Sequence, residues 1–411
     1  MPQQAPEPEE TVEILKLAHA GDGVTGDGVF VPYTVPGDVV RIAREGARAR
    51  IRNIVAPGAW RVQPPCPHFG RCGGCVLQHV AREPYLQWKR DLVIAALKQR
   101  GFSNIPVDDI HAVSPGTRRR ANFKAQASRN GVLVGFYEAA SRTLVDLNEC
   151  PILVPQLADL MEPLRAHLGG LLRPNETAEL LATLTDSGID LALKLKRARG
   201  PDLLMTLVEL ASTLKLARLS WNGEDVAVAA TPVIKIGRFS VALPPDAFLQ
   251  PTKEGERFLQ SQIAASVGKV QRVADLFSGC GTFALALAGE RAVHAIDSVP
   301  PQIEALTAAA KQGRAKLSSE VRDLFRRPLL PTELSRFDAV VLDPPRPGAA
   351  EQSRALAQAA VPRVLYVSCN AASFARDARI LADGGYRLDC VRPLDQFLWS
   401  PHVELFAEFS R

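Results

Sequence analysis

The chain has 411 residues, of which 46% are hydrophobic and 23% charged, and its formal net charge is +5. This composition is that of an ordinary soluble globular protein, and the length is too great for one core and predicts two or three domains. The mild positive charge is compatible with a polyanionic partner but does not establish one.

The first ten residues, MPQQAPEPEE, are rich in Pro and Glu. They predict a disordered tail over residues 1–10 and not a signal peptide, which would be basic and then apolar. We find no apolar stretch long enough to span a bilayer. We therefore expect a cytoplasmic protein without a membrane partner. In that compartment, metal binding or catalysis explains the seven cysteines better than disulfide bonds do.

Three further domains follow in chain order. Short β-like runs separated by Gly- and Pro-bearing turns predict a small barrel over residues 11–60. Residues 61–235 show a mixed pattern, with a cysteine-rich loop, a helix and later strands, and predict an α+β central domain. From residue 236 to 411 apolar strands alternate with helices, so we expect an α/β, doubly wound parallel sheet with ligands at the carboxyl ends of its strands.

Four cysteines of the central domain form a candidate metal site. Cys66, Cys72 and Cys75 have the spacing C-x5-C-x2-C on one glycine-rich loop, and Cys150 lies further along the chain. Four thiolates can hold either zinc or an iron–sulfur cluster, so the spacing alone does not identify the metal.

A basic run, GTRRRANFKAQASR, follows the cysteine loop. It predicts an RNA-binding strand edge in which Arg118, Arg119, Arg120 and Lys124 contact phosphates. A solvated charged face is an equally good interpretation of the same run.

The first strand of the last domain ends in ADLFSGCGTF, where Asp275 precedes Gly279 and Gly281. These glycines permit a tight turn before a helix, and Asp297 at the end of the next strand can grip a ribose. The pattern is not the G-x-G-x-x-G of dinucleotide-binding folds, so S-adenosylmethionine is a better candidate than NAD. A structural turn without a ligand is the alternative.

A third strand ends in LDPPRPG, in which Asp343 is followed by two rigid prolines. Enzymes that methylate exocyclic amines usually have an aromatic residue at the end of this tetrapeptide, whereas this chain has Arg346. The motif therefore argues against methylation of an amine.

Cys369 ends the following strand, RVLYVSC, and is either a buried inert thiol or a nucleophile. Carbon 5 of a pyrimidine is a poor nucleophile, and a thiolate that adds to carbon 6 activates it for methylation. A base must then remove the proton from carbon 5. Glu404 is the candidate, with Glu408 and His402 as rivals, and spacing cannot choose among them.

Four motifs, DLFSGCGTF, LDPPRPGA, VSCNAASFARD and HVE, together resemble those of the RNA uracil-C5 methyltransferase family. The segment AGDGVTGDGVFVPYTVPGDVV resembles the TRAM domain, an OB-like RNA-binding barrel that is typical of the ribosomal branch. The resemblance implies a Rossmann-like methyltransferase domain, S-adenosylmethionine as methyl donor, and an unstacked uracil in RNA as substrate. It favours 23S ribosomal RNA, with transfer RNA as the alternative, and we expect a monomer.

The resemblance also implies roles for individual residues. Carried over by motif, the catalytic residues are Cys369, Glu404 and Asp343, and the cofactor or site residues are Gln250, Phe277, Gly279, Thr282, Asp297, Asp323 and Asp343. The ribosomal members with this cysteine loop carry a [4Fe–4S] cluster, which implies Cys66, Cys72, Cys75 and Cys150 as its ligands, with zinc as the alternative. The chain departs from the family pattern at Thr252, Thr282, Asp297 and Ala371.

Two other functions compete with this one. A protein with a catalytically idle methyltransferase domain would bind RNA through its barrel and metal cluster, without binding S-adenosylmethionine. Cytosine-C5 methylation is disfavoured, because that chemistry usually shows a cysteine directly after the motif's prolines, where this chain has Arg346.

Overall fold

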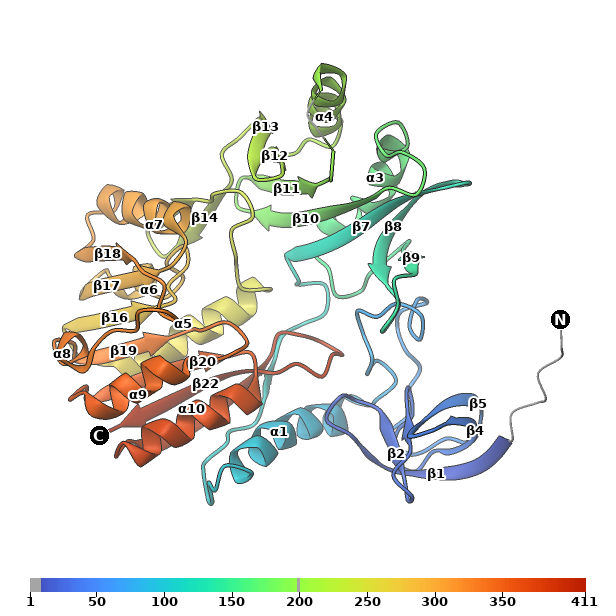
Figure 1. Cartoon of the computed structure of the whole chain (residues 1–411), viewed down its shortest axis with the longest axis horizontal. Coiled ribbons are helices and arrows are strands. Elements are labelled where there is room, and N and C mark those ends of the chain that lie inside the picture. The colour runs from blue at the N-terminus through green and yellow to red at the C-terminus, as the bar shows by residue number, and fades with distance from the viewer. Residues whose placement is uncertain (1–8, 198–199) are drawn as a thin grey trace.

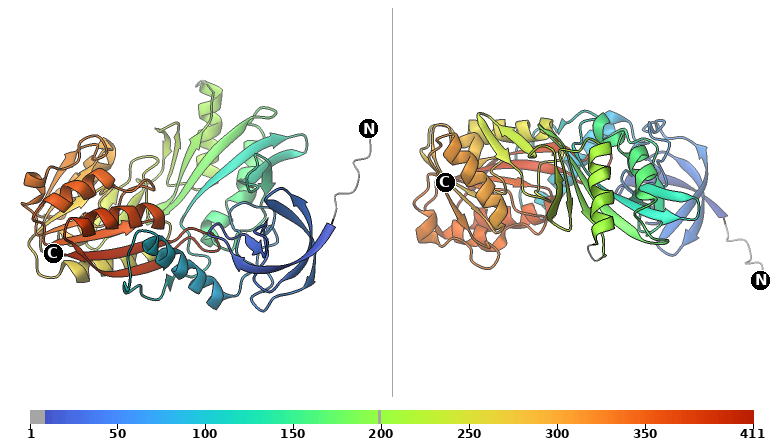
Figure 2. Two further views of the ribbon diagram at one scale, coloured as in Figure 1. Left: turned by 60° about the horizontal axis from the view of Figure 1, so that its bottom comes forward. Right: turned by 90° about the horizontal axis from the view of Figure 1, so that it is seen from above.

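A computed structural model describes residues 9–197 and 200–411 (Figure 1). Most of the predicted tail, residues 1–8, lies outside the described residues, and Glu9 and Glu10 already belong to the first strand. Figures 1 and 2 show the N-terminal barrel and the C-terminal sheet at opposite ends of the molecule. The central sheet comes between them in the sequence and, in the right-hand view of Figure 2, also in space.

The N-terminal domain is a closed five-stranded barrel, as predicted, with the strand order β1-β2-β3-β5-β4. Its interior is filled by alternate apolar side chains such as Ile14, Val40 and Ile42, none of which is exposed. The strands are β1 (Glu9–Leu17), β2 (Gly23–Thr25), β3 (Phe30–Val31), β4 (Val39–Glu45) and β5 (Arg48–Ala56).

The central domain is built on a seven-stranded sheet with the order β13-β12-β11-β10-β7-β8-β9. Three helices, α2 (Pro155–Ala158), α3 (Met161–Leu168) and α4 (Pro201–Thr213), pack on this sheet and share one apolar core with it. The strands are β7 (Arg120–Ser128), β8 (Gly131–Tyr137), β9 (Leu144–Asp146), β10 (Thr177–Thr185), β11 (Gly188–Lys194), β12 (Arg218–Trp221) and β13 (Glu224–Val228).

The C-terminal domain is the predicted doubly wound α/β sheet, with the order β18-β17-β16-β19-β20-β22-β21-β6. Val340 and Leu342 of β19 pack into the core beneath α9 (Ala350–Gln358) and α10 (Ala371–Asp383). Ala339 and Val341 pack into the core on the other face with α5 (Lys253–Val267) and α6 (Ala284–Leu287), so both faces of the sheet are covered. The strands are β16 (Arg272–Leu276), β17 (Ala292–Asp297), β18 (Leu317–Val321), β19 (Ala339–Leu342), β20 (Arg363–Ser368), β21 (Arg387–Asp395), β22 (Glu404–Ser410) and, from before the central sheet, β6 (His111–Ala112).

The helices of this domain are α5 (Lys253–Val267), α6 (Ala284–Leu287), α7 (Pro300–Gln312), α8 (Pro331–Leu334), α9 (Ala350–Gln358) and α10 (Ala371–Asp383). A two-stranded ribbon, β14 (Val233–Ile236) and β15 (Phe239–Ala242), leads into it from the central domain. Helix α1 (Arg82–Lys98) follows the cysteine loop and packs against α10 and β21. Over the described ranges, every helix is too short or too polar to cross a membrane.

A buried ion pair fastens α1 to the end of β21. Lys89 and Asp395 are both fully buried and form a salt bridge, and the hydroxyl of Tyr85 donates to the other carboxylate oxygen of Asp395 at 2.6 Å. The ammonium group of Lys89 also donates to the carbonyl of Phe397 at 3.0 Å. This network therefore fixes the start of the loop between β21 and β22.

We expect Asp395→Asn to lower the free energy of unfolding by about 3–5 kcal/mol, because it leaves the buried Lys89 charge without its partner. Denaturant unfolding followed by fluorescence measures the change. The matched control is Glu351→Ala, which breaks a half-exposed pair with Arg354 on α9 and is expected to cost less than about 1 kcal/mol. Equal losses for the two variants would show that the Lys89 network contributes no special stability.

Candidate active site

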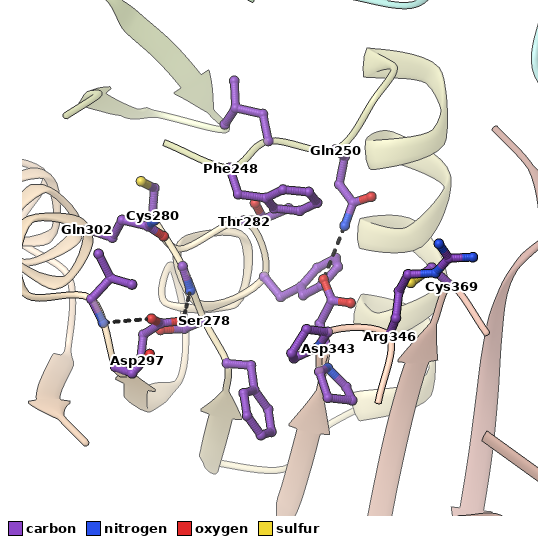
Figure 3. Close-up of a pocket in the computed structure, with 18 of the residues that line it drawn as sticks. Phe248, Gln250, Ser278, Cys280, Thr282, Asp297, Gln302, Asp343, Arg346 and Cys369 are labelled. Carbon is purple, nitrogen blue, oxygen red and sulfur yellow. Dashed lines mark hydrogen bonds between the residues drawn. The ribbon is translucent and has the colours of Figure 1, made fainter. Parts of the chain in front are cut away.

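A pocket of about 570 Å³ opens at the carboxyl ends of β16, β17, β19 and β20. Its opposite wall comes from the central sheet, through Arg120 and Asn122 of β7 and Leu181 of β10. All the predicted catalytic and cofactor residues line it: Gln250, Phe277, Gly279, Thr282, Asp297, Asp323, Asp343, Cys369 and Glu404 (several of them in Figure 3). The parallel sheet brings these distant segments together because its strand ends meet at one rim.

One end of the pocket is formed by the glycine turn after β16. The backbone turns through positive φ angles at Phe277, Gly279 and Gly281, and a Cβ at residue 281 would lie 2.6 Å from Leu306. The Asp297 carboxylate accepts hydrogen bonds from the backbone N–H of Gly279 at 2.9 Å and of Val299 at 3.0 Å (Figure 3). Asp297 therefore both holds the turn and faces the pocket.

Asp275, the acid that precedes the glycines, does not line the pocket. It is fully buried, and its burial raises its pKa well above that of an ordinary carboxyl group. The pocket end beside the glycine turn is instead lined by Asp297 and Asp323. The ring of Phe277 packs against that of Phe325, with 5.5 Å between the centroids, and Asp323 accepts from the N–H of Phe325 at 3.0 Å.

At the other end of the pocket, four side chains form a continuous hydrogen-bonded chain. The amide nitrogen of Gln250 donates to Asp343 Oδ2 at 3.1 Å (Figure 3). The amide nitrogen of Gln396 donates to Gln250 Oε1 and to Glu404 Oε2, both at 2.9 Å. Sequence reasoning missed Gln396, whose only signal was a polar residue directly after a strand.

The sheet topology explains why Glu404, and not its rivals, lies beside Cys369. Strand β22 is inserted antiparallel between β20 and β21, so its first residues lie next to the carboxyl end of β20, where Ser368 pairs with Leu405. Glu408 lies further along β22 and binds Arg363 at 2.9 Å. His402 does not line the pocket and contacts Arg346, with 3.0 Å between Nη2 and Nδ1.

The electrostatics of this end favour the protonated states of its acids. Burial raises the pKa of Asp343 to about 7, and burial together with the Asp343 charge raises the pKa of Glu404 to about 8. Burial and the same two carboxylates raise the pKa of the Cys369 thiol to about 11, although Arg346 acts in the opposite direction. The protein alone therefore holds Cys369 as a thiol at neutral pH.

The basic run divides between the pocket and the protein interior. Arg118 and Arg120 line the pocket, and the guanidinium of Arg120 lies over the half-exposed ring of Phe248 at 5.5 Å. The prediction that Arg119 contacts RNA is wrong, because Arg119 is 2% exposed and is bound to Glu256 at 2.5 Å. Lys124 is paired with Glu179 at 2.7 Å. Phe248 was not predicted from the sequence.

The four cysteines Cys66, Cys72, Cys75 and Cys150 line one small cavity between the cysteine loop and the central sheet. Burial raises the pKa of Cys75 to about 12 and that of Cys150 to about 11, and the neighbouring cysteines add to both effects. Within residues 9–197 and 200–411, however, no three His, Cys, Asp or Glu side chains are grouped so that they could hold a metal ion. The structure therefore does not support the predicted zinc or iron–sulfur site.

Comparisons with known proteins agree with this architecture. The chain is 44% identical to an uncharacterized RNA methyltransferase of Brucella suis and 41% identical to one of Caulobacter vibrioides, over 97% and 98% of this chain and 97% and 100% of theirs. It is 32% identical to the 23S rRNA (uracil(1939)-C(5))-methyltransferase RlmD of Halomonas elongata, over 95% of this chain and 87% of that protein.

The fold matches that of the Pyrococcus abyssi tRNA (uracil-54, C5)-methyltransferase in complex with S-adenosyl-L-homocysteine, with a TM-score of 0.77 over 97% of this chain and 100% of that one. The sequence identity to that structure is 22%, so this likeness concerns the fold alone. The profile of the tRNA (Uracil-5-)-methyltransferase family matches residues 228–408. The predicted resemblance is thus confirmed, and the chain belongs to the RNA uracil-C5 methyltransferase family.

Proposed function

We propose that this protein methylates carbon 5 of a uracil in RNA through a covalent adduct between Cys369 and carbon 6 of the base. The observation that carries the proposal is that Cys369, Glu404 and Asp343 meet at one end of a pocket whose other end is a glycine turn held by Asp297. The turn and the facing Asp297 carboxylate fit the nucleoside part of a methyl donor. S-adenosylmethionine would be this donor and would supply the electrophilic methyl group.

The reaction begins when the sulfur of Cys369 adds to carbon 6 and the electron pair of the C5–C6 double bond moves toward the carbon 4 carbonyl. The N–H of Gln250 lies within the pocket and would stabilise the negative charge that develops on that oxygen. Carbon 5 would then take the methyl group of the donor, which would leave as S-adenosylhomocysteine. Removal of the carbon 5 proton restores the double bond and expels the Cys369 thiolate, so that the enzyme is regenerated.

Glu404 is the base in this proposal, since it lies in the pocket and is 3% exposed. Its raised pKa makes its carboxylate a stronger base than an exposed glutamate. Burial raises the pKa of Asp343 to about 7, so Asp343 ionises before Glu404, and its charge raises the pKa of Glu404 further because two adjacent buried carboxylates repel each other. Because the free protein holds Cys369 as a thiol, its proton must pass to solvent when the uracil binds, so that the thiolate adds to carbon 6, and the thiolate expelled at the end takes a proton back.

We infer that the substrate is ribosomal RNA, with transfer RNA as the second candidate. The 32% identity to a 23S rRNA methyltransferase, along 95% of this chain, supports the first, and the name of the matching family profile supports the second. Arg118 and Arg120 on the pocket wall would contact phosphates on either side of a base that has been flipped out of its stack. Mass-spectrometric mapping of 5-methyluridine in RNA from a deletion strain distinguishes the two substrates.

We also propose that the four cysteines bind an iron–sulfur cluster, on the chemistry of the donor set. The four thiols line one cavity, and four thiolates are a usual ligand set for an iron–sulfur cluster, with zinc as the alternative. The role would be structural, since the methyl transfer moves no net electrons. We expect anaerobically purified wild-type protein to contain iron and sulfide, and the Cys75→Ser variant to lack them, as measured by visible absorption and metal analysis. Wild-type protein that contains no iron, and whose unfolding is unchanged by Cys75→Ser, would contradict this proposal.

A further inference from the structure

Gln396 connects the two sides of the proposed catalytic site. It follows β21 directly, is 2% exposed, and donates both hydrogens of its amide nitrogen, one to Glu404 and one to Gln250. No residue of the sequence motifs performs this connection. Gln250 and Glu404, which would act in different steps of the proposed reaction, are therefore both held in place by one carboxamide.

The hydrogen bonds determine which way each amide group points. An ionised Glu404 can only accept, so the nitrogen of Gln396 must face it. The second hydrogen of that nitrogen then occupies the oxygen of Gln250, which leaves the nitrogen of Gln250 to face Asp343. One hydrogen of the Gln250 nitrogen has no partner among the described residues, so Gln250 offers the pocket a donor and not an acceptor.

We propose that Gln396 is a positioning residue that holds Glu404 in place for proton removal and fixes Gln250 as a hydrogen-bond donor, which selects uracil over cytosine. The inference rests on the proposed function. Uracil carries a carbonyl oxygen at carbon 4, which accepts from such a donor, whereas cytosine carries an amino group there, which does not. If Gln396 were absent, the Gln250 amide could rotate and present its oxygen to the pocket.

The surroundings of Gln396 hold it rigidly, as a positioning role requires. Asp395, the preceding residue, is locked by its pair with Lys89. Beyond it, the carbonyl of Trp399 accepts hydrogen bonds from the N–H groups of Val76 at 2.8 Å and Leu77 at 3.1 Å. Helix α5 contributes Gly255, where an added Cβ would lie 2.5 Å from the amide oxygen of Gln396.

Gln396→Met tests the proposal, because methionine is similar in length but cannot donate. The titratable and charged groups that face Glu404 are Asp343 and Cys369, with Arg346 beside the thiol, and none of them is altered. We expect release of the methylated adduct to require a higher pH than in the wild type, because the Gln396 hydrogen bond stabilises the Glu404 carboxylate. The adduct should then accumulate, and the preference for uridine over cytidine RNA should fall about tenfold, the effect of one lost hydrogen bond.

The matched control is Gln352→Met. Gln352 is also buried and exchanges two hydrogen bonds with the backbone of Leu329, but it does not line the pocket. It should lose a similar amount of stability and keep the wild-type pH profile and base preference. Gly255→Ala provides a second variant, which displaces Gln396 without changing its chemistry and should reproduce a weaker form of the same shift.

A Gln396→Met or Gly255→Ala protein that folds and keeps the wild-type pH profile and base preference would overturn the proposal. The proposed function would survive that result as long as the wild type forms 5-methyluridine and Cys369→Ala does not. Wild-type protein that forms no 5-methyluridine would instead overturn the function itself, so the two failures are distinguishable.

Discussion

Cys369→Ala is expected to reduce methyl transfer by about 10⁴-fold or more, since removal of a nucleophile that forms a covalent intermediate leaves only binding and electrostatic effects. Cys369 lies at the end of β20, in the pocket with Asp343 and Glu404. The measurement is transfer of labelled methyl groups from S-adenosylmethionine to unmodified RNA. The variant should also fail to form a covalent complex with RNA containing 5-fluorouridine, which cannot lose its carbon 5 substituent as a proton.

The control for this variant is Cys390→Ala. Cys390 is a half-buried cysteine of β21 that does not line the pocket. It should retain activity close to the wild type and still form the fluorouridine complex. Both variants should bind S-adenosylhomocysteine normally by calorimetry. Substantial activity in Cys369→Ala would contradict the covalent route.

Glu404→Gln is expected to reduce turnover by about 10²–10⁴-fold, the usual contribution of a general base. The methyl group should still transfer, because the base acts after it, so a methylated covalent adduct should accumulate on ordinary uridine RNA and be visible in a denaturing gel. In the wild type, release of the product should become faster as the pH rises toward about 8, since Glu404 must be ionised to take the proton.

Glu408→Gln is the matched control on the same strand. Glu408 binds Arg363 and the hydroxyl of Ser266, away from the pocket, so its loss should affect stability but not adduct release. If Glu408→Gln accumulated the adduct and Glu404→Gln did not, the assignment of the base would be wrong.

The raised pKa of Glu404 also has a consequence for stability. Between the ordinary glutamate pKa of 4.5 and about 8, the folded protein binds this proton more strongly than the unfolded chain, so its contribution to stability falls as the pH rises through that window. Glu404→Gln removes this loss. The stability of the variant relative to the wild type should therefore be greater at pH 8 than at pH 4.5. The wild type thus loses stability by keeping this buried glutamate, as active sites commonly do.

The parallel part of the C-terminal sheet was predictable because each strand is a short apolar run that ends in a polar residue. Asp297, Asp343 and Cys369 all follow such runs, and parallel strands bring their ends to one rim. The insertion of β22 between β20 and β21 was not predictable from periodicity, since the same alternation fits any neighbour in the sheet. That insertion is what separates Glu404 from Glu408.

The wrong prediction for Arg119 in the basic run has a simple cause in strand geometry. Successive side chains of extended chain point to opposite sides, so three consecutive arginines cannot all face RNA. Arg118 and Arg120 line the pocket, whereas Arg119 points into the protein and pairs with Glu256. Gln396 was missed for a different reason, since its importance depends on contacts with Gln250 and Glu404 that only the folded chain creates.

The most direct test of the central claim is to incubate the purified protein with S-adenosylmethionine and unmodified ribosomal and transfer RNA, and to identify the methylated nucleoside by mass spectrometry. The account predicts 5-methyluridine at a defined site, formed by the wild type and absent with Cys369→Ala. Methylation of a nitrogen, of the ribose or of cytosine, or the absence of any methylation by protein that binds the cofactor, would contradict it.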